Sequence, residues 1–393
     1  MGMLWPKRKI KEFANVIGGG TPSKKVPDYF NGGISWITPK DLSGYQSRFI
    51  SEGANNITEL GLKKSSAKLL PKSTILFSSR APIGYVVIAN KPLSTNQGFR
   101  NLVCDQSMVS VDFVYYILKQ SVPAIEAISS GATFKEVSGT ILGNFEVPLP
   151  PLYIQKKIAA ILSAYDDLIE NNLRRITILE DMVQLIYREW FVHFRFPGHE
   201  KIKIVDSPLG KIPEGWEVKK LKDVLELKYG KALKKTDRLD GDVPVYGSSG
   251  IVGFHNNYLV QGPGIIVGRK GNVGSVFWSD EDFYPIDTTY FVSSILPLRF
   301  LFYELQNKNF INNDAAVPGL NRNQAYSLEL VVPTDDMLLK FCRVADDLEK
   351  QANILIKKND ILHQTRDLLL PKLISGELDV SDLDIKLPEE VSA

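Results

Sequence analysis

The sequence repeats itself, and landmarks of its first half return in the same order in its second half. The stretch Leu76–Val86 (LFSSRAPIGYV) resembles Ile266–Val276 (IVGRKGNVGSV), and Trp5–Phe13 resembles Trp216–Val224. Each half then closes on an apolar stretch that runs into proline and is followed by a long helical pattern. The repeat predicts two similar globular units, each followed by a long helix, and therefore two similar surfaces in place of one cleft.

Length and composition limit the class of protein. A chain of 393 residues that is 44% apolar can bury several hydrophobic cores. It lacks an apolar run of the roughly 20 residues that a membrane helix needs, and its first residues lack a signal-peptide core, so we expect a cytoplasmic protein without a membrane partner. Cys104 and Cys342 are far apart and lack metal-site spacing, which predicts neither a disulfide nor a metal site.

Charge is distributed unevenly along the chain. Residues 1–150 contain 17 Lys and Arg against 10 Asp and Glu, whereas residues 334–393 contain 8 against 13. Residues 211–238 form a basic strip, which is either a binding surface or a hydrated face. A basic first unit suits a polyanion such as nucleic acid.

Two long helices are predicted from hydrophobic periodicity. Apolar residues recur at steps of three and four from Leu152 to about Phe194, and the same pattern returns in Leu338–Leu373. Helices of this length need a partner along them, so we expect the two to pack antiparallel as a coiled-coil stalk. The predicted seam residues are Ile161, Leu168, Ile176, Leu179, Val183, Leu348, Leu355, Leu362 and Leu369.

The globular units combine short strands with helices. Short β-like runs alternate with Gly, Pro, Asn and Ser, and the helical segment at Val111–Lys119 has a counterpart at Pro297–Gln306. The predicted fold class is α+β, with two similar mixed α/β domains separated by two long antiparallel helices. The predicted boundaries are a first domain at 1–151, a helix at 152–196, a second domain at 197–333, a helix at 334–376 and an acidic tail at 377–393.

Motifs for catalysis are missing from the sequence. An adenine methyltransferase needs an Asn/Asp-Pro-Pro-Tyr/Phe motif and a translocating ATPase needs GxxxxGK[ST], and the chain contains neither. Its four histidines show no metal-binding spacing. We therefore predict no catalytic residues.

The order of these landmarks resembles the DNA-specificity subunit of Type I restriction-modification systems. The resemblance rests on Trp216, Leu221 and Asp223 at the start of the second unit, on the two repeated turns, on the proline exits into helices, and on the ending Leu370–Leu378 (LPKLISGEL). It covers nearly the whole chain.

This resemblance implies a non-catalytic subunit. Each globular unit would be a target-recognition domain for one half of a bipartite site in double-stranded DNA. The helices would set the spacer and dock two methyltransferase subunits, and restriction/translocase subunits would join the full complex. Adenine-N6 methylation and ATP-dependent cleavage, with S-adenosylmethionine, ATP and Mg²⁺, would belong to those partner subunits, leaving no cofactor in this chain.

The chain departs from the family pattern in two places. The family often has an acidic residue and Gln after the exit proline; the first copy contains Gln155, but the second lacks the glutamine. In the repeated turn, Lys270 aligns better than Arg269 with Arg80.

Candidate DNA contacts lie on corresponding turns of the two halves. Arg80 follows two serines, and Arg269 and Lys270 lie between two glycines, where a cation can reach a phosphate or pair with guanine. The alternative is a hairpin turn with a hydrated cation. The full set of candidates is Thr21, Ser23, Lys24, Ser78, Ser79, Arg80, Asn96, Gln97, Thr133, Lys135, Lys231, Lys234, Tyr246, Ser248, Ser249, Arg269, Lys270, Asn321 and Arg322.

Two alignments of these candidates link the halves. Asn96 and Gln97, whose amides suit adenine, occupy a position that resembles Asp287 and Thr288. Thr133 and Lys135 correspond roughly to Asn321 and Arg322. An alternative from a different class is a non-catalytic coiled-coil adaptor whose repeated domains bind protein or carbohydrate.

Overall fold

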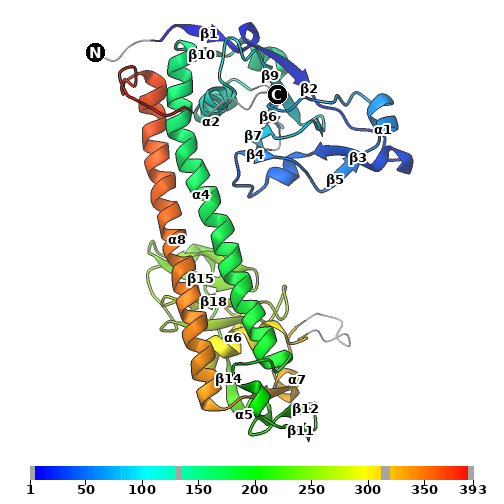
Figure 1. Cartoon of the computed structure of the whole chain (residues 1–393), viewed down its shortest axis with the longest axis vertical. Coiled ribbons are helices and arrows are strands. Elements are labelled where there is room, and N and C mark those ends of the chain that lie inside the picture. The colour runs from blue at the N-terminus through cyan, green and yellow to red at the C-terminus, as the bar shows by residue number, and fades with distance from the viewer. Residues whose placement is uncertain (1–4, 81, 130–134, 311–318, 388–393) are drawn as a thin grey trace. The chain divides into compact units, whose positions relative to one another are not determined.

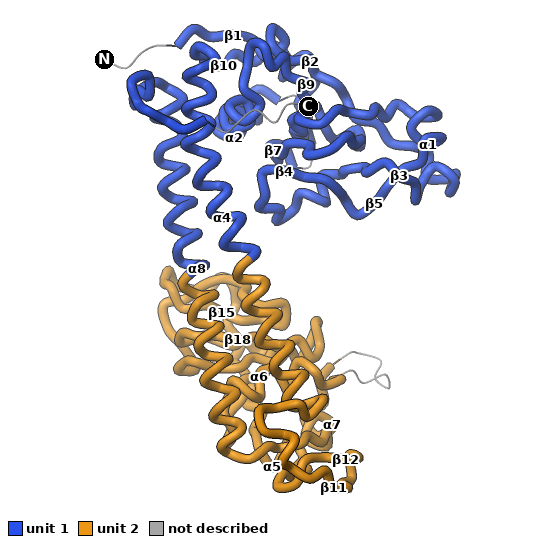
Figure 2. Tube along the Cα trace, viewed as in Figure 1, with its two compact units in different colours: residues 1–174, 355–393 blue, residues 175–354 orange. Residues whose placement is uncertain are grey.

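The chain forms two compact units, each with one globular domain and part of both long helices (Figure 2). Unit 1 consists of residues 1–174 and 355–393, and unit 2 consists of residues 175–354. The predicted α+β class and the internal repeat are confirmed. The computed structural model describes residues 5–80, 82–129, 135–310 and 319–387.

The domain of unit 1 is built around a five-stranded sheet (Figure 1). Its strand order is β2 (Ala14–Gly18), β9 (Phe99–Cys104), β6 (Ile75–Ser79), β7 (Ile83–Ala89) and β4 (Phe49–Ile50). A three-stranded sheet has the order β5 (Asn55–Ile57), β3 (Phe30–Ile37) and β8 (Ser94–Thr95), and β1 (Lys7–Lys9) pairs with β10 (Glu146–Pro148). The helices are α1 (Glu59–Lys63), α2 (Val111–Ala127) and α3 (Gly139–Asn144).

The domain of unit 2 repeats this plan with a four-stranded sheet. Its order is β14 (Leu225–Tyr229), β20 (Thr289–Ser294), β17 (Gly264–Gly268) and β18 (Val276–Ser279). The three-stranded sheet is β16 (Gly250–His255), β15 (Val243–Gly247) and β19 (Tyr284–Pro285), and β13 (Glu217–Lys220) pairs with β21 (Glu329–Val332). The helices are α5 (Leu221–Val224), α6 (Leu298–Gln306) and α7 (Arg322–Ser327), and β11 (Ile204–Ser207) and β12 (Gly210–Pro213) form a hairpin.

The same capping turn opens both domains. The backbone N–H of Lys9 donates to Glu12 Oε1 at 3.1 Å, and the N–H of Lys220 donates to Asp223 Oδ2 at 3.1 Å. In each case the carboxylate satisfies an N–H at the start of a short helical turn, which the helix itself leaves unpaired. The similar stretches Trp5–Phe13 and Trp216–Val224 therefore contain the same capping turn.

Both predicted long helices are present, as α4 (Leu152–Tyr187) and α8 (Asp335–Ser375). The predicted end of the first helix at residue 196 is wrong, because α4 ends at Tyr187 and a π-helical turn follows over Arg188–Val192. The change of path lets Phe196 stack on Trp216, with ring centroids 5.1 Å apart, in the core of unit 2. No helix of the described residues is long and apolar enough to cross a membrane.

The two helices pack antiparallel within each unit. In unit 1, Asp166 pairs with Arg366, and Asn172 Nδ2 donates to Asn359 Oδ1 at 2.8 Å. In unit 2, the ring of Tyr187 lies 6.1 Å from that of Phe341. Residue numbers rise along α4 as those of their partners on α8 fall, so the predicted antiparallel pairing is confirmed.

Most of the predicted seam lies inside. Leu168 is the exception, since it is 52% exposed and its neighbour Ile169 is 2% exposed. One residue is a rotation of about 100° on a helix, which is enough to move a side chain from the seam to the surface. The buried seam residues are Ile176, Val183 and Leu355, and the partly buried ones are Ile161, Leu179, Leu348, Leu362 and Leu369.

The described part of the acidic tail packs against unit 1. Lys157 Nζ on α4 donates to the carbonyl oxygens of Val380, Ser381 and Leu383 at 3.3, 2.7 and 2.9 Å. Val380 is 2% exposed and belongs to the unit 1 core. This segment is therefore part of the unit 1 fold as far as Ile385, which packs against the same core.

Loss of the buried ion pair between the helices should destabilise the protein. In Arg366→Ala, Asp166 would lose its ion pair, keep the 2.6 Å hydrogen bond from Tyr116 and remain almost buried. We expect the free energy of unfolding to fall by about 3 kcal/mol, measured by urea denaturation. Lys340→Ala, which breaks the exposed pair with Asp336, should cost about 0.5 kcal/mol or less. Equal losses in the two variants would contradict this account.

Candidate nucleic-acid interface

The basic turn of the first domain follows β6 and is fixed by two backbone hydrogen bonds. The N–H of Ser79 donates to the carbonyl of Gly98 at 2.7 Å, and the carbonyl of Ser79 accepts from the N–H of Val137 at 2.9 Å. Arg80 comes next in the chain. The segment before α3 and the residue that precedes β9 therefore hold this turn from both sides.

The same two bonds fix the basic turn of the second domain, which follows β17. The N–H of Arg269 donates to the carbonyl of Thr288, and its carbonyl accepts from the N–H of Leu320, both at 2.8 Å. Arg269 therefore corresponds in space to Ser79.

This correspondence settles the alignment of the turns. Arg80 corresponds to Lys270, as the sequence indicated. Because Gly98 and Thr288 occupy the same place, Gln97 aligns with Asp287. The sequence-based alignment of Asn96 with Asp287 was wrong by one residue, because strand pairing sets the register and sequence similarity in this loop is too low to do so.

Two arginines share one carboxylate in the first domain. Arg100 Nη2 lies 2.8 Å from Glu136 Oε1, and Arg80 Nη1 lies 3.8 Å from Glu136 Oε2. The side chains of Arg80 and Glu136 are 38% and 37% exposed, and that of Arg100 is 19% exposed. The cluster is therefore open to solvent and carries two positive charges and one negative charge.

Two arginines surround a tyrosine in the second domain. The guanidinium carbons of Arg269 and Arg322 each lie 5.2 Å from the ring centroid of Tyr229, within the range of cation–π attraction. Arg269 also lies 5.9 Å from the ring of Tyr290. These residues and Lys270 line a depression of about 410 Å³ that contains no carboxylate among the described residues. Three cationic side chains thus converge on one surface.

Helix caps identify further corresponding residues. Ser138 Oγ accepts from the N–H of Ile141 at 3.1 Å at the start of α3, and Asn321 Oδ1 accepts from the N–H of Asn323 at 2.9 Å at the start of α7. Ser138 therefore corresponds to Asn321.

It follows that Gly139 corresponds to Arg322. The predicted correspondence of Lys135 with Arg322 is wrong, because Lys135 lies four residues earlier, ahead of the helix cap. The other residue of that prediction, Thr133, lies outside the described residues.

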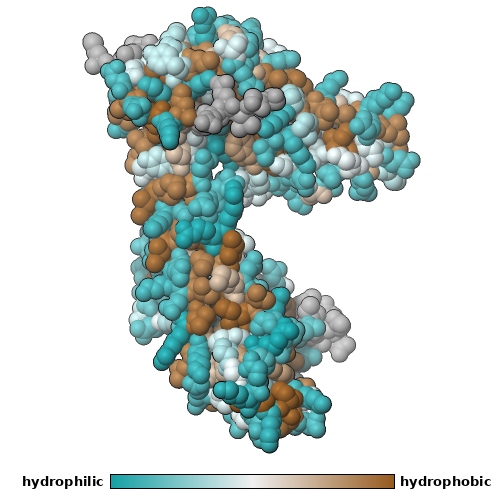
Figure 3. All heavy atoms as spheres, viewed as in Figure 1, coloured by the Kyte–Doolittle hydropathy of each residue, from teal (hydrophilic) through white to brown (hydrophobic). Residues whose placement is uncertain are grey.

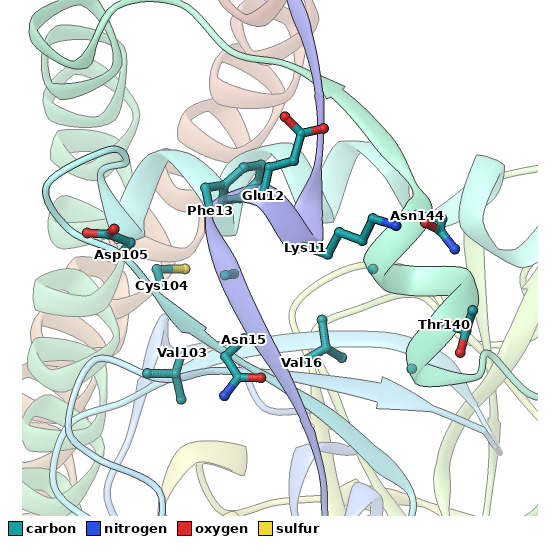
Figure 4. A pocket seen from close by; sticks show the side chains of 13 residues that line it. Lys11, Glu12, Phe13, Asn15, Val16, Val103, Cys104, Asp105, Thr140 and Asn144 are labelled. Atoms are coloured by element: carbon teal, nitrogen blue, oxygen red, sulfur yellow. The ribbon is translucent and has the colours of Figure 1, made fainter.

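The first domain has a depression that is larger than that of the second domain and is lined in part by glycines (Figure 4). It measures about 800 Å³ between β2, β9 and α3. Gly143 lies in its wall, and the corresponding Tyr326 of the second domain fills that place, where its hydroxyl accepts from the N–H of Leu227 at 2.9 Å. Cys104 also lines the depression, and burial raises the pKa of its thiol to about 12, so it stays protonated at neutral pH.

Three predicted contact residues are buried, and the structure contradicts their assignment to DNA. Ser78 Oγ donates to the carbonyl of Pro82 and accepts from the N–H of Tyr85, both at 2.8 Å. Ser79 Oγ donates to Gly98 O at 3.1 Å. Tyr246 is 6% exposed in a small apolar core. Their polar groups form hydrogen bonds within the domain, which hold the turns in place.

Other candidates take part in local hydrogen bonds. The hydroxyl of Thr21 donates to Gln97, Asn96 Oδ1 accepts from the N–H of Gly98 at 2.9 Å, and the Asn321 oxygen caps α7. Ser248 is half-buried and its carbonyl accepts from the hydroxyl of Ser275. The exposed candidates that stay predictions are Ser23, Lys24, Gln97, Lys135, Lys231, Lys234 and Ser249.

Sequence reasoning missed four residues of the two clusters. These are Arg100 and Glu136 in the first domain and Tyr229 and Tyr290 in the second. Gly18 pairs with Arg100 and Tyr229 pairs with Tyr290, in equivalent strands. Aligning the strand ends of the two halves could have found them, but glycine opposite tyrosine provides no similarity to align.

The positive charges around Tyr229 should affect the pKa of its hydroxyl, which a titration can measure. A hydrogen bond with Tyr290 and the positive charges of Arg322 and Arg269 hold the pKa of Tyr229 below its usual value. In Arg322→Ala we expect this pKa to rise, because the phenolate loses a neighbouring cation. NMR titration of ¹³C-labelled tyrosine measures it, with Arg80→Ala as a control that should leave it unchanged. An unchanged Tyr229 titration in Arg322→Ala would contradict the stacked arrangement.

Comparison with known proteins identifies the family. Residues 3–180 and 213–337 match the family model described as Type I restriction modification DNA specificity domain. The chain is 33% identical to the Type I restriction enzyme MjaIX specificity subunit of Methanocaldococcus jannaschii, over 96% of this chain and 94% of that protein. It is 28% identical to the EcoR124I/EcoR124II specificity subunit of Escherichia coli over half of this chain.

A solved structure has the same fold. The S subunit of a Type I restriction-modification system from M. genitalium matches with a TM-score of 0.59 at 20% identity, over 94% of this chain and 96% of that one. Family model, relatives and fold agree along most of this chain. The chain belongs to the family of Type I restriction-modification DNA specificity subunits.

Proposed function

We propose that each globular domain recognises one half of a bipartite site in double-stranded DNA, through the cluster at its basic turn. The observation that supports this is the position of the clusters. Equivalent strand ends carry Arg80 and Arg100 in the first domain and Arg269 and Lys270 in the second, where Arg322 joins them from the start of α7. A shared scaffold with different side chains at one place is suited to recognising two different sequences.

The chemistry of the clusters suits DNA. A guanidinium can donate two parallel hydrogen bonds to a phosphate or to the O6 and N7 atoms of guanine. Cation–π contacts with Tyr229 restrict the side chains of Arg269 and Arg322 before DNA binds, which lowers the conformational entropy lost on binding. The second cluster has no carboxylate among its described lining residues, so its attraction for phosphate is not offset locally.

Each cluster should affect its own half-site. We expect Arg269→Ala to weaken recognition of the second half-site by roughly ten- to a hundredfold, as the loss of one bidentate contact does, and Arg80→Ala to affect only the first. Mapping of N6-methyladenine in DNA from a host that expresses the chain with its methyltransferase measures both. Arg8→Ala removes an arginine that is exposed outside both clusters and should change neither half. Equal loss at both halves in either variant would contradict separate recognition.

The long helices are the second part of the proposal: they set the spacer between half-sites and dock two methyltransferase subunits. Apolar side chains reach the surface along them (Figure 3). On α8, Ile354, Ile361 and Leu368 are 45%, 63% and 69% exposed and recur every seven residues, on one side of the helix. Exposed apolar rows of this kind mark protein–protein contacts. Further exposed apolar residues on α4 are Leu168, Ile178, Met182 and Leu185.

A charge in this row should weaken assembly. We expect Ile361→Glu to reduce the affinity for the methyltransferase at least tenfold, because the interface would bury an unpaired carboxylate. Analytical ultracentrifugation or co-purification measures it. Ile356→Glu makes the same chemical change at another exposed isoleucine, 43% exposed and on a different side of α8, and is the matched control. Normal assembly of Ile361→Glu would show that the methyltransferase docks on another surface of the protein.

Catalysis belongs to the partner subunits in this proposal. The methyltransferase subunits would supply S-adenosylmethionine-dependent adenine methylation, and translocating nuclease subunits would supply ATP- and Mg²⁺-dependent cleavage. The described residues of this chain contain no group of three His, Cys, Asp or Glu side chains that could hold a metal ion.

A further inference from the structure

Arg322 has a fixed place in the second cluster, while its guanidinium stays unpaired among the described residues. It is the first residue of α7, and Asn321 before it caps the helix by accepting from the N–H groups of Asn323 at 2.9 Å and Gln324 at 3.4 Å. The backbone of Arg322 is therefore held. Its guanidinium forms no hydrogen bond or ion pair in the described part of the chain, so its five N–H donors are available to a ligand.

Aromatic rings restrict this guanidinium. Its central carbon lies 5.2 Å from the ring centroid of Tyr229 and 5.9 Å from that of Tyr326. The ring faces attract the positive charge and leave the N–H groups able to donate to oxygen or nitrogen acceptors. The side chain of Arg322 is half-exposed, so acceptors can reach it from outside the protein.

The fold does not require an arginine at this position. In the first domain α3 forms with Gly139 at the corresponding place, behind the Ser138 cap. Glycines also occupy the places of Tyr229 and Tyr326 in the first domain. Arg322 and its two rings are therefore an addition of the second domain to the shared scaffold.

The depression around Arg322 favours a ligand with hydrogen-bond acceptors. Arg269 and Lys270 line it together with Arg322, and no carboxylate does so among its described residues. In the major groove, guanine alone presents two neighbouring acceptors, O6 and N7. The fork of an arginine matches such a pair, whereas Lys270 is exposed and is a compact charge suited to a phosphate.

Resting on the proposed function, we propose that Arg322 is a specificity-determining residue of the second domain that donates two parallel hydrogen bonds to O6 and N7 of a guanine in the second half-site. Adenine and cytosine present an amino donor in the major groove, which faces the donors of the guanidinium and is rejected. Thymine presents a single acceptor there. The first domain, with Gly139, lacks this contact.

The test compares Arg322→Gln with the parent chain in the complete methyltransferase complex. Glutamine presents one donor and one acceptor, a pair that suits adenine and not guanine. Methylation mapping over a randomised target library should show the preference for guanine falling at least tenfold at one position of the second half-site, with adenine gaining most. The first half-site should stay unchanged.

Two further variants separate specificity from folding. Arg322→Ala removes the donors, at a position where Gly139 shows that the helix forms without them, and should relax the same position. Arg188→Gln makes the same chemical change as Arg322→Gln at an exposed arginine of unit 2 outside the cluster and should leave the motif intact. Thermal unfolding shows whether each variant is folded. Loss of folding in both Arg322 variants would overturn the inference, because the arginine would then be needed by the fold.

The outcomes distinguish this inference from the proposed function. An unchanged motif in Arg322→Gln overturns the role of Arg322, and so does a uniform loss of affinity, which would identify a phosphate contact. A relaxed position that required no guanine on either strand in the parent motif also overturns it. Each of these results leaves bipartite recognition standing. If the parent complex methylates without any bipartite motif, the proposed function itself is wrong.

Discussion

Antiparallel pairing of α4 and α8 is the interaction on which the rest of the structure depends, because both globular domains use these helices as part of their cores. In unit 1, Ile158 and Leu373 belong to the same apolar cluster as the five-stranded sheet, and in unit 2 Val183 and Phe341 belong to that of the four-stranded sheet. Asn172 and Asn359 place a hydrogen-bonded polar pair inside the seam of unit 1. A sliding of the helices would separate these amides, so the pair favours one register.

The two halves of the internal repeat share a backbone scaffold and differ in the side chains at its surface. Capping turns, the order of the shared strands and the hydrogen bonds around the basic turns are the same in both domains, and β4 extends the sheet of the first domain alone. The side chains at the end of this scaffold differ in size and charge. The corresponding pairs are Gly18 and Tyr229, Ser79 and Arg269, Arg100 and Tyr290, Glu136 and Gly319, Gly139 and Arg322, and Gly143 and Tyr326.

Much of the fold followed from the sequence, and less of the candidate site did. Periodicity predicted both long helices and their pairing, because an amphipathic pattern over many turns has few alternative structures. It misplaced Leu168, where a shift of one residue turns a side chain out of the seam. Arg80, Arg269 and Lys270 were placed on turns because turns show in local sequence, and their contact with DNA stays a prediction. Ser78 and Ser79 were misassigned because burial depends on strands far along the chain.

The sequence by itself determined the repeat, the fold class, the helices and the family, since these depend on local patterns and on the order of motifs. Tertiary structure alone decided which residues share a cluster. Arg100 and Glu136 are brought together by β9 and the segment before α3, and Arg269 and Arg322 by β17 and the start of α7. Strand pairing and helix docking bring such residues together. Both are driven by the burial of the sheet faces, which depends on segments far apart in the chain and leaves no local pattern in the sequence.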